Sequence, residues 1–249
     1  MALSWRKNEI KLSMPIQNEN KYEDILKRYP KKRIDLSEEY KRIYKEHYFL
    51  NRAGTGFFNF LSQTMESWMH KKISKIQGNE ILELGAGNLN HIKCENNFSN
   101  YDIVEPFKDL YEQSSSKSLL RNTYNSLDEI NQKYDKIFSI ATLEHLTNLP
   151  KEILLCKGLL KEDGVFQAAV PCEGEFAFKL GWKLTTSIAF RLKYNLDYSK
   201  LIKFEHVNSI EEIYTIIENN FKIVKFQRSP FILPIKHLSF YAYFECKLN

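Results

Sequence analysis

Short apolar runs alternate with longer polar or amphipathic stretches from Glu80 onward. The apolar runs have the length of buried strands, and the stretches between them can hold amphipathic helices. This pattern predicts a parallel sheet covered by helices on both faces. Five such strands are predicted, at 81–84, at 101–104, around Thr123, at 136–140 and at 165–170.

A helix is predicted between the fourth and fifth of these strands. Pro150 stands where the first helical turn needs no N–H group, so it marks the start of a helix over 151–160. The sequence Glu162-Asp163-Gly164 then predicts a turn into the fifth strand.

The end of the chain predicts a capped helix and two further strands. Ser209 and Glu212 have the spacing of a capping box. The helix that follows carries its apolar side chains on one face, namely Ile210, Ile213, Tyr214 and Ile217. Strands are predicted over 221–226 and 240–248, and in the second, four residues share one face: Phe240, Ala242, Phe244 and Cys246.

Residues 1–75 are predicted to form an N-terminal helical cap. A short helix is predicted over 22–28, and a second helix follows the capping-box residues Asp35 and Glu38. After a break at 53–56, a third helix carries apolar side chains on one face.

The remaining residues, 76–249, are expected to form one α/β domain, because 249 residues suffice for a single domain with appendages. The aromatic-rich segment at about 172–208 interrupts the rhythm of strands and helices and is predicted to be a lid insertion over the edge of the sheet. Hydrophobic residues make up 43% of the chain and charged residues 27%, which is an ordinary globular balance.

Several classes of partner are not expected. The chain has no run of 18 apolar residues and no secretory signal, so we expect a cytoplasmic protein without membrane insertion. The net charge is +5, and the one basic cluster, at 27–33, is interpreted as a solvated face, so no nucleic-acid partner is expected. The oligomeric state stays open, with a homodimer as one alternative.

The cysteines indicate no metal site. They are widely spaced, form no C-x-x-C pair and have no neighbouring set of histidines, so neither a zinc site nor a disulfide framework is predicted for Cys94, Cys156, Cys172 and Cys246. Reduced and mostly buried thiols are expected.

The first predicted strand runs directly into a glycine turn, in the stretch I-L-E-L-G-A-G-N-L-N at 81–90. Residues without side chains let the backbone approach a nucleotide-like ligand and donate N–H groups to it. Asn90 stands where the dinucleotide fingerprint has its third glycine. This departure disfavours a nicotinamide dinucleotide and permits S-adenosylmethionine (SAM), although many such turns are purely structural.

An acidic residue ends the second predicted strand. Glu105 follows Val104 and lies eighteen positions beyond Gly87, where a carboxylate can accept hydrogen bonds from both ribose hydroxyls of a bound nucleoside. Taken alone, Glu105 could equally be a solvent-facing residue at a strand end. Together with the glycine turn it predicts a ribose site.

Four motifs, in this order, resemble those of class I SAM-dependent methyltransferases: E-L-G-A-G-x-L at 83–89, V-E-P at 104–106, Y-D-K-I-F-S-I-A-T-L-E-H-L at 134–146 and L-x-x-D-G-V-F at 160–166. The resemblance covers about residues 75–248. It implies an enzyme with SAM as its cofactor and a Rossmann-like, doubly wound, seven-stranded sheet of order 3-2-1-4-5-7-6 with strand 7 antiparallel. The two closing strands predicted above agree with that topology.

The resemblance implies cofactor contacts at matching positions. The methionine part of SAM would lie over the glycine turn, the ribose at the acid, the adenine at the loop after the third strand and the methyl group at the end of the fourth. Asn125 and Ser126 stand where many relatives have an aspartate, so the adenine contact departs from the family pattern. The implied residues are Glu83, Gly85, Ala86, Gly87, Glu105, Pro106, Ser126, Leu127, Ala141 and Thr142.

The segment Leu143-Glu144-His145-Leu146 resembles the L-E-H-[VL] segment of small-molecule methyltransferases. Methyl transfer from a sulfonium is an in-line displacement, and a hydroxyl acceptor must also lose a proton. His145 is therefore the candidate catalytic base, with a packing role as an equal alternative. The chain has no N-P-P-Y or D-P-P-Y after the fourth strand, which argues against methylation of adenine or glutamine amides.

Three stretches, at 170–175, 181–186 and 196–208, resemble methyltransferases associated with bacterial surface-polysaccharide gene clusters. This implies a small acceptor that is methylated on oxygen or nitrogen: a sugar, a sugar nucleotide or a phosphorylated metabolite. The expected acceptor-binding residues are Arg52, Glu144, Glu173, Arg191, Glu205 and His206. A surface salt bridge for Arg52 and a helix-capping role for residues 205–208 remain alternatives.

Two other functions stay open. A SAM-binding module without catalysis could serve a partner enzyme. A nicotinamide-dependent sugar-modifying enzyme is opposed by Asn90 and by the position of the only Y-x-x-x-K sequence, Tyr243 to Lys247, in a predicted terminal strand.

Overall fold

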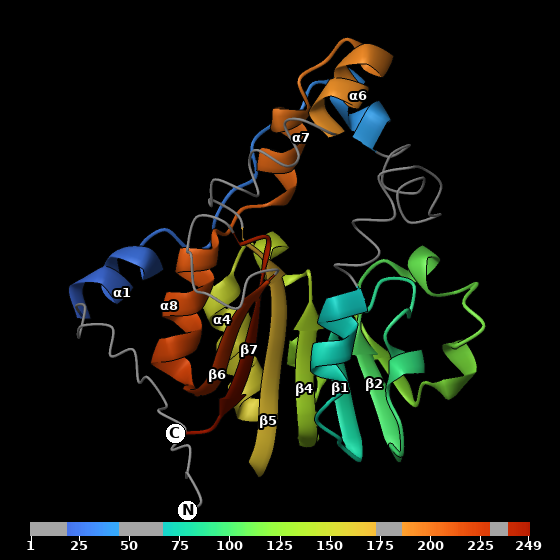
Figure 1. Ribbon diagram of the computed structural model, residues 1–249, viewed down its shortest axis with the longest axis vertical. Helices are drawn as coiled ribbons and strands as arrows, with labels where there is room; N and C mark the ends of the chain where they lie inside the picture. Colours follow the sequence, from blue (N-terminus) through green and yellow to red (C-terminus); the bar gives the residue numbers. More distant parts are fainter. Residues whose placement is uncertain (1–18, 45–66, 173–185, 230–238) are drawn as a thin grey trace, which may run out of the picture.

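The computed structural model describes residues 19–44, 67–172, 186–229 and 239–249. Its centre is a seven-stranded sheet in the order β3-β2-β1-β4-β5-β7-β6 (Figure 1). β7 runs antiparallel to β5 and β6, whereas the other neighbours are parallel, so the predicted fold class is confirmed. The strands are β1 Glu80–Leu84, β2 Asn100–Val104, β3 Asn122–Tyr124, β4 Tyr134–Ile140, β5 Leu160–Pro171, β6 Lys222–Ser229 and β7 Tyr241–Lys247.

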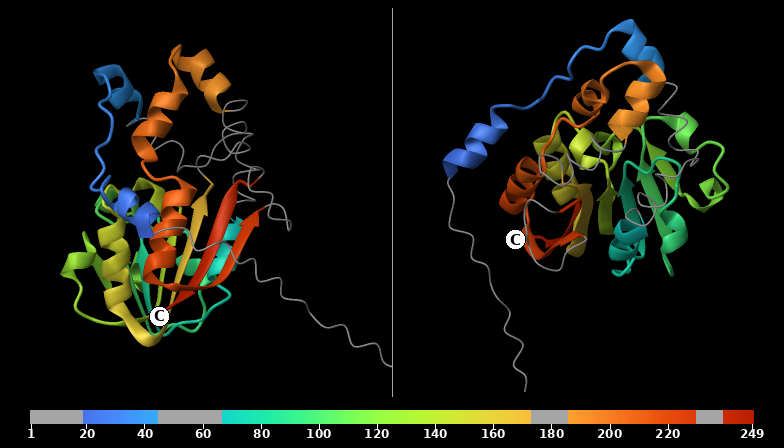
Figure 2. Two further views of the ribbon diagram at one scale, coloured as in Figure 1. Left: turned by 90° about the vertical axis from the view of Figure 1, so that its left-hand side faces the viewer. Right: turned by 45° about the horizontal axis from the view of Figure 1, so that its top comes forward.

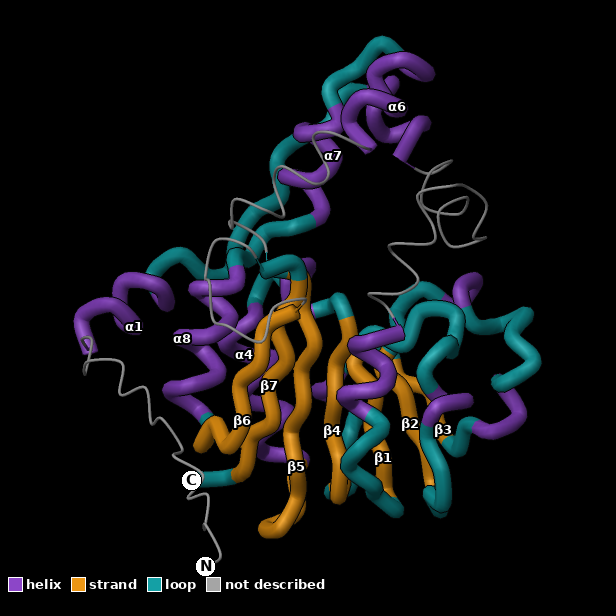
Figure 3. The backbone as a smooth tube through the Cα atoms, in the orientation of Figure 1, coloured by secondary structure: helices purple, strands orange, loops and turns teal. Residues whose placement is uncertain are grey.

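The connections between β1 and β4 were predicted to be helices or loops. The tube in Figure 3 shows loops with short 3-10 turns. Serines and asparagines are frequent in these stretches and bond to nearby backbone groups, as Ser114 does in accepting the N–H of Ser116, which favours turns over helix. The 3-10 turns are η1 Ile92–Cys94, η2 Lys108–Leu110, η3 Lys117–Leu119, η4 Leu127–Glu129 and, after β4, η5 Leu143–His145.

The helix between β4 and β5 is α4, Leu149–Leu159, with Pro150 in its first turn as predicted. The turn predicted at Glu162-Asp163-Gly164 is wrong, because β5 already begins at Leu160. Leu160 pairs with Tyr134 of β4, and the register then shifts before Val165. The three residues therefore form an irregularity inside the strand.

Side chains that alternate along the strands fill two cores, one on each face of the sheet. Leu82 and Leu84 belong to the core under α4 and α8, the latter spanning Ile210–Asn220. Ile81 lies in the opposite core, with Met69 from the helical residues 67–73. The predicted capping box at the start of α8 is confirmed, since Ser209 and Glu212 bond to each other's backbone N–H.

Two further helices, α6 Thr186–Tyr194 and α7 Tyr198–Glu205, project from one end of the sheet (Figure 1). They pack with the helical residues 38–44 in a separate hydrophobic cluster, and all views in Figure 2 show these segments together. The cluster contains Leu36, Tyr40, Ile43, Phe190 and Leu201. Part of the predicted N-terminal cap and part of the predicted lid are thus one helical unit.

The first described helix, α1 Glu19–Leu26, lies outside this helical unit and packs beside α8. Its Ile25 is buried in the core of the sheet domain. Across the described ranges, no helix combines the length and apolar character that a membrane crossing requires.

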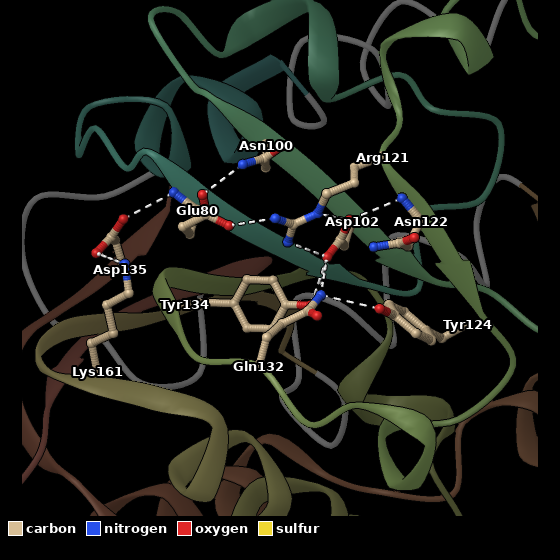
Figure 4. A network of polar contacts seen from close by, with 10 residues as sticks. All are labelled: Glu80, Asn100, Asp102, Arg121, Asn122, Tyr124, Gln132, Tyr134, Asp135 and Lys161. Carbon is tan, nitrogen blue, oxygen red and sulfur yellow. Dashed lines mark hydrogen bonds and ion pairs between the residues drawn. The ribbon is translucent and has the colours of Figure 1, made fainter.

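A buried carboxylate ties together the edge of the sheet that is formed by β1, β2 and β3 (Figure 4). Asp102 of β2 receives two hydrogen bonds from the Arg121 guanidinium, at 3.0 and 2.6 Å, and one from the Tyr134 hydroxyl at 2.8 Å. Burial alone would raise the pKa of Asp102, but these hydrogen bonds outweigh it and hold the pKa below its usual value. Arg121 also reaches Glu80 of β1, so one guanidinium links two strands.

The opposite face of the sheet contains a second buried polar network. Lys136 of β4 donates to Glu95 at 2.5 Å, and His91 lies 2.6 Å from the same carboxylate. All four cysteines are free and three are buried, as expected. His70 and His91 lie beside Cys94 in space, a proximity that the spacing of the residues in the sequence did not indicate.

Candidate functional site

The turn after β1 has the backbone geometry that the glycines were predicted to supply. Gly85 and Gly87 adopt positive φ angles of 77° and 53°. A Cβ atom at Gly85 would lie 2.2 Å from the Thr142 hydroxyl oxygen, so the end of β4 packs directly against this turn. Position 85 therefore requires glycine both for its φ angle and for the close approach of Thr142.

Glu105 lies at the carboxyl end of β2 and is 5% exposed. Its Oε2 accepts the N–H of Gly87 at 2.8 Å, and its Oε1 accepts the N–H of Phe107 at 3.1 Å. Each carboxylate oxygen can accept a second hydrogen bond, so the group can still receive two hydroxyl donors. The structure thus brings together the glycine turn and the acid that the sequence analysis paired, while Pro106 beside them is exposed.

Glu83 points away from solvent, into the core on the Lys136 face of the sheet. It is 3% exposed, and its Oε2 accepts the hydroxyl of Tyr101 at 2.6 Å. Burial raises the pKa of Glu83 to about 8, and the carboxylates of Glu95 and Glu105 contribute to the rise. Glu83 is therefore mostly protonated at neutral pH in this structure.

The loop after β3 differs in part from what the resemblance implied. Leu127 is 1% exposed and belongs to the core under α4 and α8, so its side chain is unavailable to an adenine. Ser126 caps η4 by accepting the N–H of Asp128. Ser126 is partly exposed at this edge of the sheet. An adenine contact by the Ser126 side chain and the Leu127 backbone therefore stays a prediction.

The carboxyl end of β4 carries the residues expected near the reactive methyl group. Ala141 adopts a positive φ of 48°, which turns the chain sharply out of the strand. The Thr142 hydroxyl donates to the carbonyls of Ile140, at 3.1 Å, and Gly85, at 3.4 Å. Ala86 of the glycine turn is buried in the core that contains Ile81 and Met69.

His145 lies in η5, directly after this turn, and its ring orientation is fixed. Its Nδ1 is 3.0 Å from the carbonyl oxygen of Glu205, which can only accept a hydrogen bond. Nδ1 therefore carries the proton, and Nε2 of the neutral ring has a lone pair. That Nε2 lies 3.6 Å from Oε1 of Glu144, whose side chain is 1% exposed.

The segment after α7 is bonded to η5. The backbone N–H groups of Val207 and Asn208 both donate to the carbonyl of Glu144, at 2.8 and 3.0 Å. The Asn208 side chain donates to the carbonyls of Leu143 and Leu146. His206 lies within this segment, and its ring centroid is 4.7 Å from that of His145.

Arg33 is a residue of the site that the sequence analysis missed. Its guanidinium donates to the carbonyls of His145 at 2.7 Å and Glu205 at 3.0 Å, and so bridges η5 and α7. Lys31 donates to the carbonyl of Val207 and pairs with Glu212. The interpretation of the basic cluster as a solvated face is therefore wrong for Arg33 and Lys31, because both contact groups distant in sequence.

A pocket of about 410 Å³ lies beside His206. Four of its lining residues are cationic, and the carboxylate of Glu212 contacts two of them. The lining residues are Arg28, Pro30, Lys31, Lys32, Lys203, His206 and Val207. Cations gathered at a concave surface favour an anionic ligand.

Two of the remaining predicted acceptor residues, Arg191 and Glu205, lie in the described part of the chain. Arg191 is exposed on α6. Arg52 and Glu173 lie outside the described residues. Glu205 contributes its backbone carbonyl to the His145 contact.

Comparison with known proteins identifies the architecture. The fold matches a SAM-dependent methyltransferase from Clostridium acetobutylicum with a TM-score of 0.53 and 13% identity, covering 84% of this chain and 99% of that one. It matches the plantazolicin methyltransferase BpumL, solved with S-adenosylhomocysteine (SAH) and a substrate analogue, with a TM-score of 0.56 and 12% identity over 84% and 90% of the two chains. A SAM-dependent methyltransferase from Thermotoga maritima gives 0.55 and 13% over 84% and 99%.

This is the SAM-dependent methyltransferase fold. No family model and no curated protein sequence matches the chain, so the likeness lies in the architecture. In a methyltransferase fold of this kind, as in other open α/β sheets, ligands bind at the carboxyl ends of the parallel strands. Those ends carry the glycine turn, Glu105, Thr142 and His145 in this chain.

Proposed function

We propose that this chain is a methyltransferase that binds SAM and passes its methyl group to a small acceptor. The observation that carries the proposal is the hydrogen bond from the Gly87 N–H to the Glu105 carboxylate. It joins the glycine turn after β1 to the acidic residue after β2 that is expected to bind ribose. The fold and the solved neighbours that contain SAH support the same cofactor. In the proposed complex, Glu105 accepts the ribose hydroxyls and the glycine turn lies beneath the methionine part.

The methyl group would then lie near Thr142 and the turn at Ala141. Because the displacement is in line, the protein mainly holds the acceptor atom, the methyl carbon and the sulfur in one line. The Nδ1 contact with Glu205 orients the ring of His145, and in the neutral form of the ring Nε2 is the nitrogen with a lone pair. That atom can receive the proton of a hydroxyl or ammonium acceptor.

The acceptor is proposed to carry an anionic group, as sugar nucleotides and phosphorylated metabolites do. The pocket lined by Lys32 and Lys203 adjoins His206, whose ring contacts that of His145. The resemblance of residues 196–208 to methyltransferases of surface-polysaccharide clusters is consistent with such an acceptor. Reversing the charge of Lys32 and Lys203 together should raise the KM of a phosphorylated acceptor while leaving SAM affinity unchanged.

Calorimetric titration tests the cofactor directly. The full chain should bind SAM and SAH and should bind a nicotinamide dinucleotide far more weakly. Preference for the dinucleotide, or no affinity for SAM and SAH, would overturn the proposal. SAM binding without turnover on any neutral or phosphorylated acceptor would favour the alternative of a non-catalytic SAM-binding module.

Turnover tests the role of His145. The variant His145→Ala should lower turnover while leaving SAM affinity unchanged, because the ring acts on the acceptor side. His70→Ala is a matched control, since this histidine lies away from the strand ends of the proposed site, beside His91 and Cys94. Unaltered turnover in His145→Ala would remove His145 from the mechanism.

A further inference from the structure

Three side chains beside the proposed site form a donor set of which the methyl-transfer scheme uses only His145. Glu144, His145 and His206 each offer one ligand atom, and these atoms lie within 4.8 Å of one another. We propose that they bind a divalent transition-metal ion, of which Zn²⁺ is the type. The proposal rests on the proposed methyltransferase function for its chemical role, but metal binding itself can be tested separately.

The donor types fit such an ion. Two imidazoles and one carboxylate are the protein ligands of many catalytic zinc sites, which keep a further position open for water or substrate. Ligand atoms on a tetrahedral zinc, about 2.1 Å from the metal, are about 3.4 Å apart. Nε2 of His145 and Oε1 of Glu144 are 3.6 Å apart, which is too long for a hydrogen bond and close to that separation.

The tautomer of His145 also fits. A histidine that binds a metal usually donates its other ring N–H to a carbonyl or carboxylate, which fixes the ring and leaves one nitrogen as ligand. Nδ1 of His145 donates to the carbonyl of Glu205 at 3.0 Å, so in the neutral ring the lone pair is on Nε2, the atom 3.6 Å from Oε1 of Glu144. A base and a metal ligand need the same tautomer, but one Nε2 lone pair cannot fill both roles at once. With a metal bound, the ligand role of His145 replaces the base role given above, and the neighbouring imidazole and carboxylate favour the ligand.

The backbone that carries the three ligands is held on both sides. Val207 and Asn208 flank His206 and donate to the carbonyl of Glu144. Arg33 joins the carbonyls of His145 and Glu205. A metal site needs ligands that are positioned by their supporting residues, and these contacts connect all three ligands without using their metal-binding atoms.

The chemical consequence concerns the acceptor. A hydroxyl oxygen bound in the open position becomes more acidic, and its proton passes to bulk water. The oxygen then forms a bond to the methyl carbon as the bond from carbon to the sulfonium sulfur breaks. The products are a methyl ether, neutral SAH and one released proton, so the substrate class is a hydroxyl compound that can bind a metal ion through oxygen.

Co²⁺ is the probe for the experiment, because its visible absorption reports coordination and its thiolate complexes have an additional charge-transfer band. The full-length chain, stripped with a chelator, should bind one Co²⁺ at a site without that thiolate band, and Zn²⁺ should displace it. Glu144→Gln and His206→Asn should each weaken Co²⁺ binding at least tenfold. Both variants should retain the SAM affinity of the unaltered chain.

The matched control is His70→Asn, because His70, His91 and Cys94 form a second cluster among the described residues that could hold an ion. That variant should bind Co²⁺ at the proposed site as tightly as the unaltered chain. No Co²⁺ or Zn²⁺ binding, binding undiminished in both Glu144→Gln and His206→Asn, or binding that disappears with His70→Asn would overturn the inference. A chain that binds SAM but no metal would refute the metal site alone, and one that binds metal but no SAM would refute the proposed function alone.

Discussion

Gly87 donates its backbone N–H to Oε2 of Glu105 across 2.8 Å, although the two residues are eighteen positions apart. One carboxylate thus fixes the turn after β1 and also presents its remaining lone pairs at the proposed ribose position. Ligand affinity and the conformation of the glycine turn should therefore respond to the same substitution.

Replacing Glu105 by alanine should weaken SAM binding by at least about tenfold, a loss of about 1.4 kcal/mol or more, because the ribose hydroxyls lose their acceptor. Isothermal titration of the variant measures this directly. Asp109→Ala is the control, since Asp109 is an exposed acid in the same loop and should leave the affinity unchanged. An affinity for SAM that does not change in Glu105→Ala would exclude the ribose role.

Gly85→Ala should destabilise the chain and abolish SAM binding. The new Cβ would lie 2.2 Å from the Thr142 hydroxyl oxygen, and a positive φ alone costs an alanine about 1 kcal/mol. Thermal unfolding should show a lower Tm. Adding Thr142→Gly removes the colliding side chain but not the φ penalty, so the double variant should recover part of the lost Tm; no recovery would show that Thr142 is not the obstacle.

Glu83 should make the protein less stable as the pH rises toward 8. Its pKa is about 8 in the folded chain because of burial, against 4.5 as its ordinary value, so the folded chain keeps a proton that the unfolded chain has released. His91 opposes this trend at lower pH, because burial lowers its pKa to about 4 from 6.5, and stability from its neutral form is lost as the pH falls. Above pH 6.5 the effect of Glu83 should dominate this pair, at up to about 1.4 kcal/mol per pH unit.

Glu83→Gln tests this pH dependence, because the amide keeps the shape of the side chain and cannot ionise. Urea unfolding between pH 6.5 and 8 should give a flatter profile for the variant than for the unaltered chain. Parallel profiles for the two proteins would mean that Glu83 is already ionised in the folded state.

Arg121→Met should lower the free energy of unfolding by about 2 kcal/mol, because the buried carboxylate of Asp102 loses its two charged hydrogen bonds. Chemical denaturation at neutral pH measures the loss. Lys117→Met is the control, since Lys117 pairs with Glu112 at the surface and should change stability by less than about 1 kcal/mol. The double variant Arg121→Met/Asp102→Asn should be less impaired than Arg121→Met, and equal or greater impairment would contradict the account.

The sheet could be predicted from the sequence because its signal is local. Ile81 and Leu82 face opposite cores, as the alternation of side chains along a strand requires. The apolar runs place the strands close to their observed bounds, except that β5 begins at Leu160 and not at 165. The order of the strands came from the motif resemblance. The connections after β1, β2 and β3 could not be assigned to helix or loop, because a polar stretch of suitable length can form either a helix or successive turns.

The glycine turn and Glu105 could also be predicted, since each stands directly at the end of a strand. The setting of His145 could not, because its ring is oriented by Glu205, sixty residues away, and its backbone by Arg33. No local pattern encodes such contacts; they arise when α7 folds back toward η5. Leu127 shows the converse, because its position beside the site did not indicate that its side chain lies in the core.

The hydrophobic cluster that joins residues 36–44 to α6 and α7 has a practical consequence for anyone who shortens this chain. A truncation at residue 75 would follow the boundary that the sequence suggests, yet it would strip Phe190 and Leu201 of their packing partners and remove Ile25 and Met69 from the two cores of the sheet. It would also delete Arg33, whose guanidinium connects the carbonyls of His145 and Glu205. Crystallisation or assay of the isolated sheet domain would therefore examine a damaged molecule.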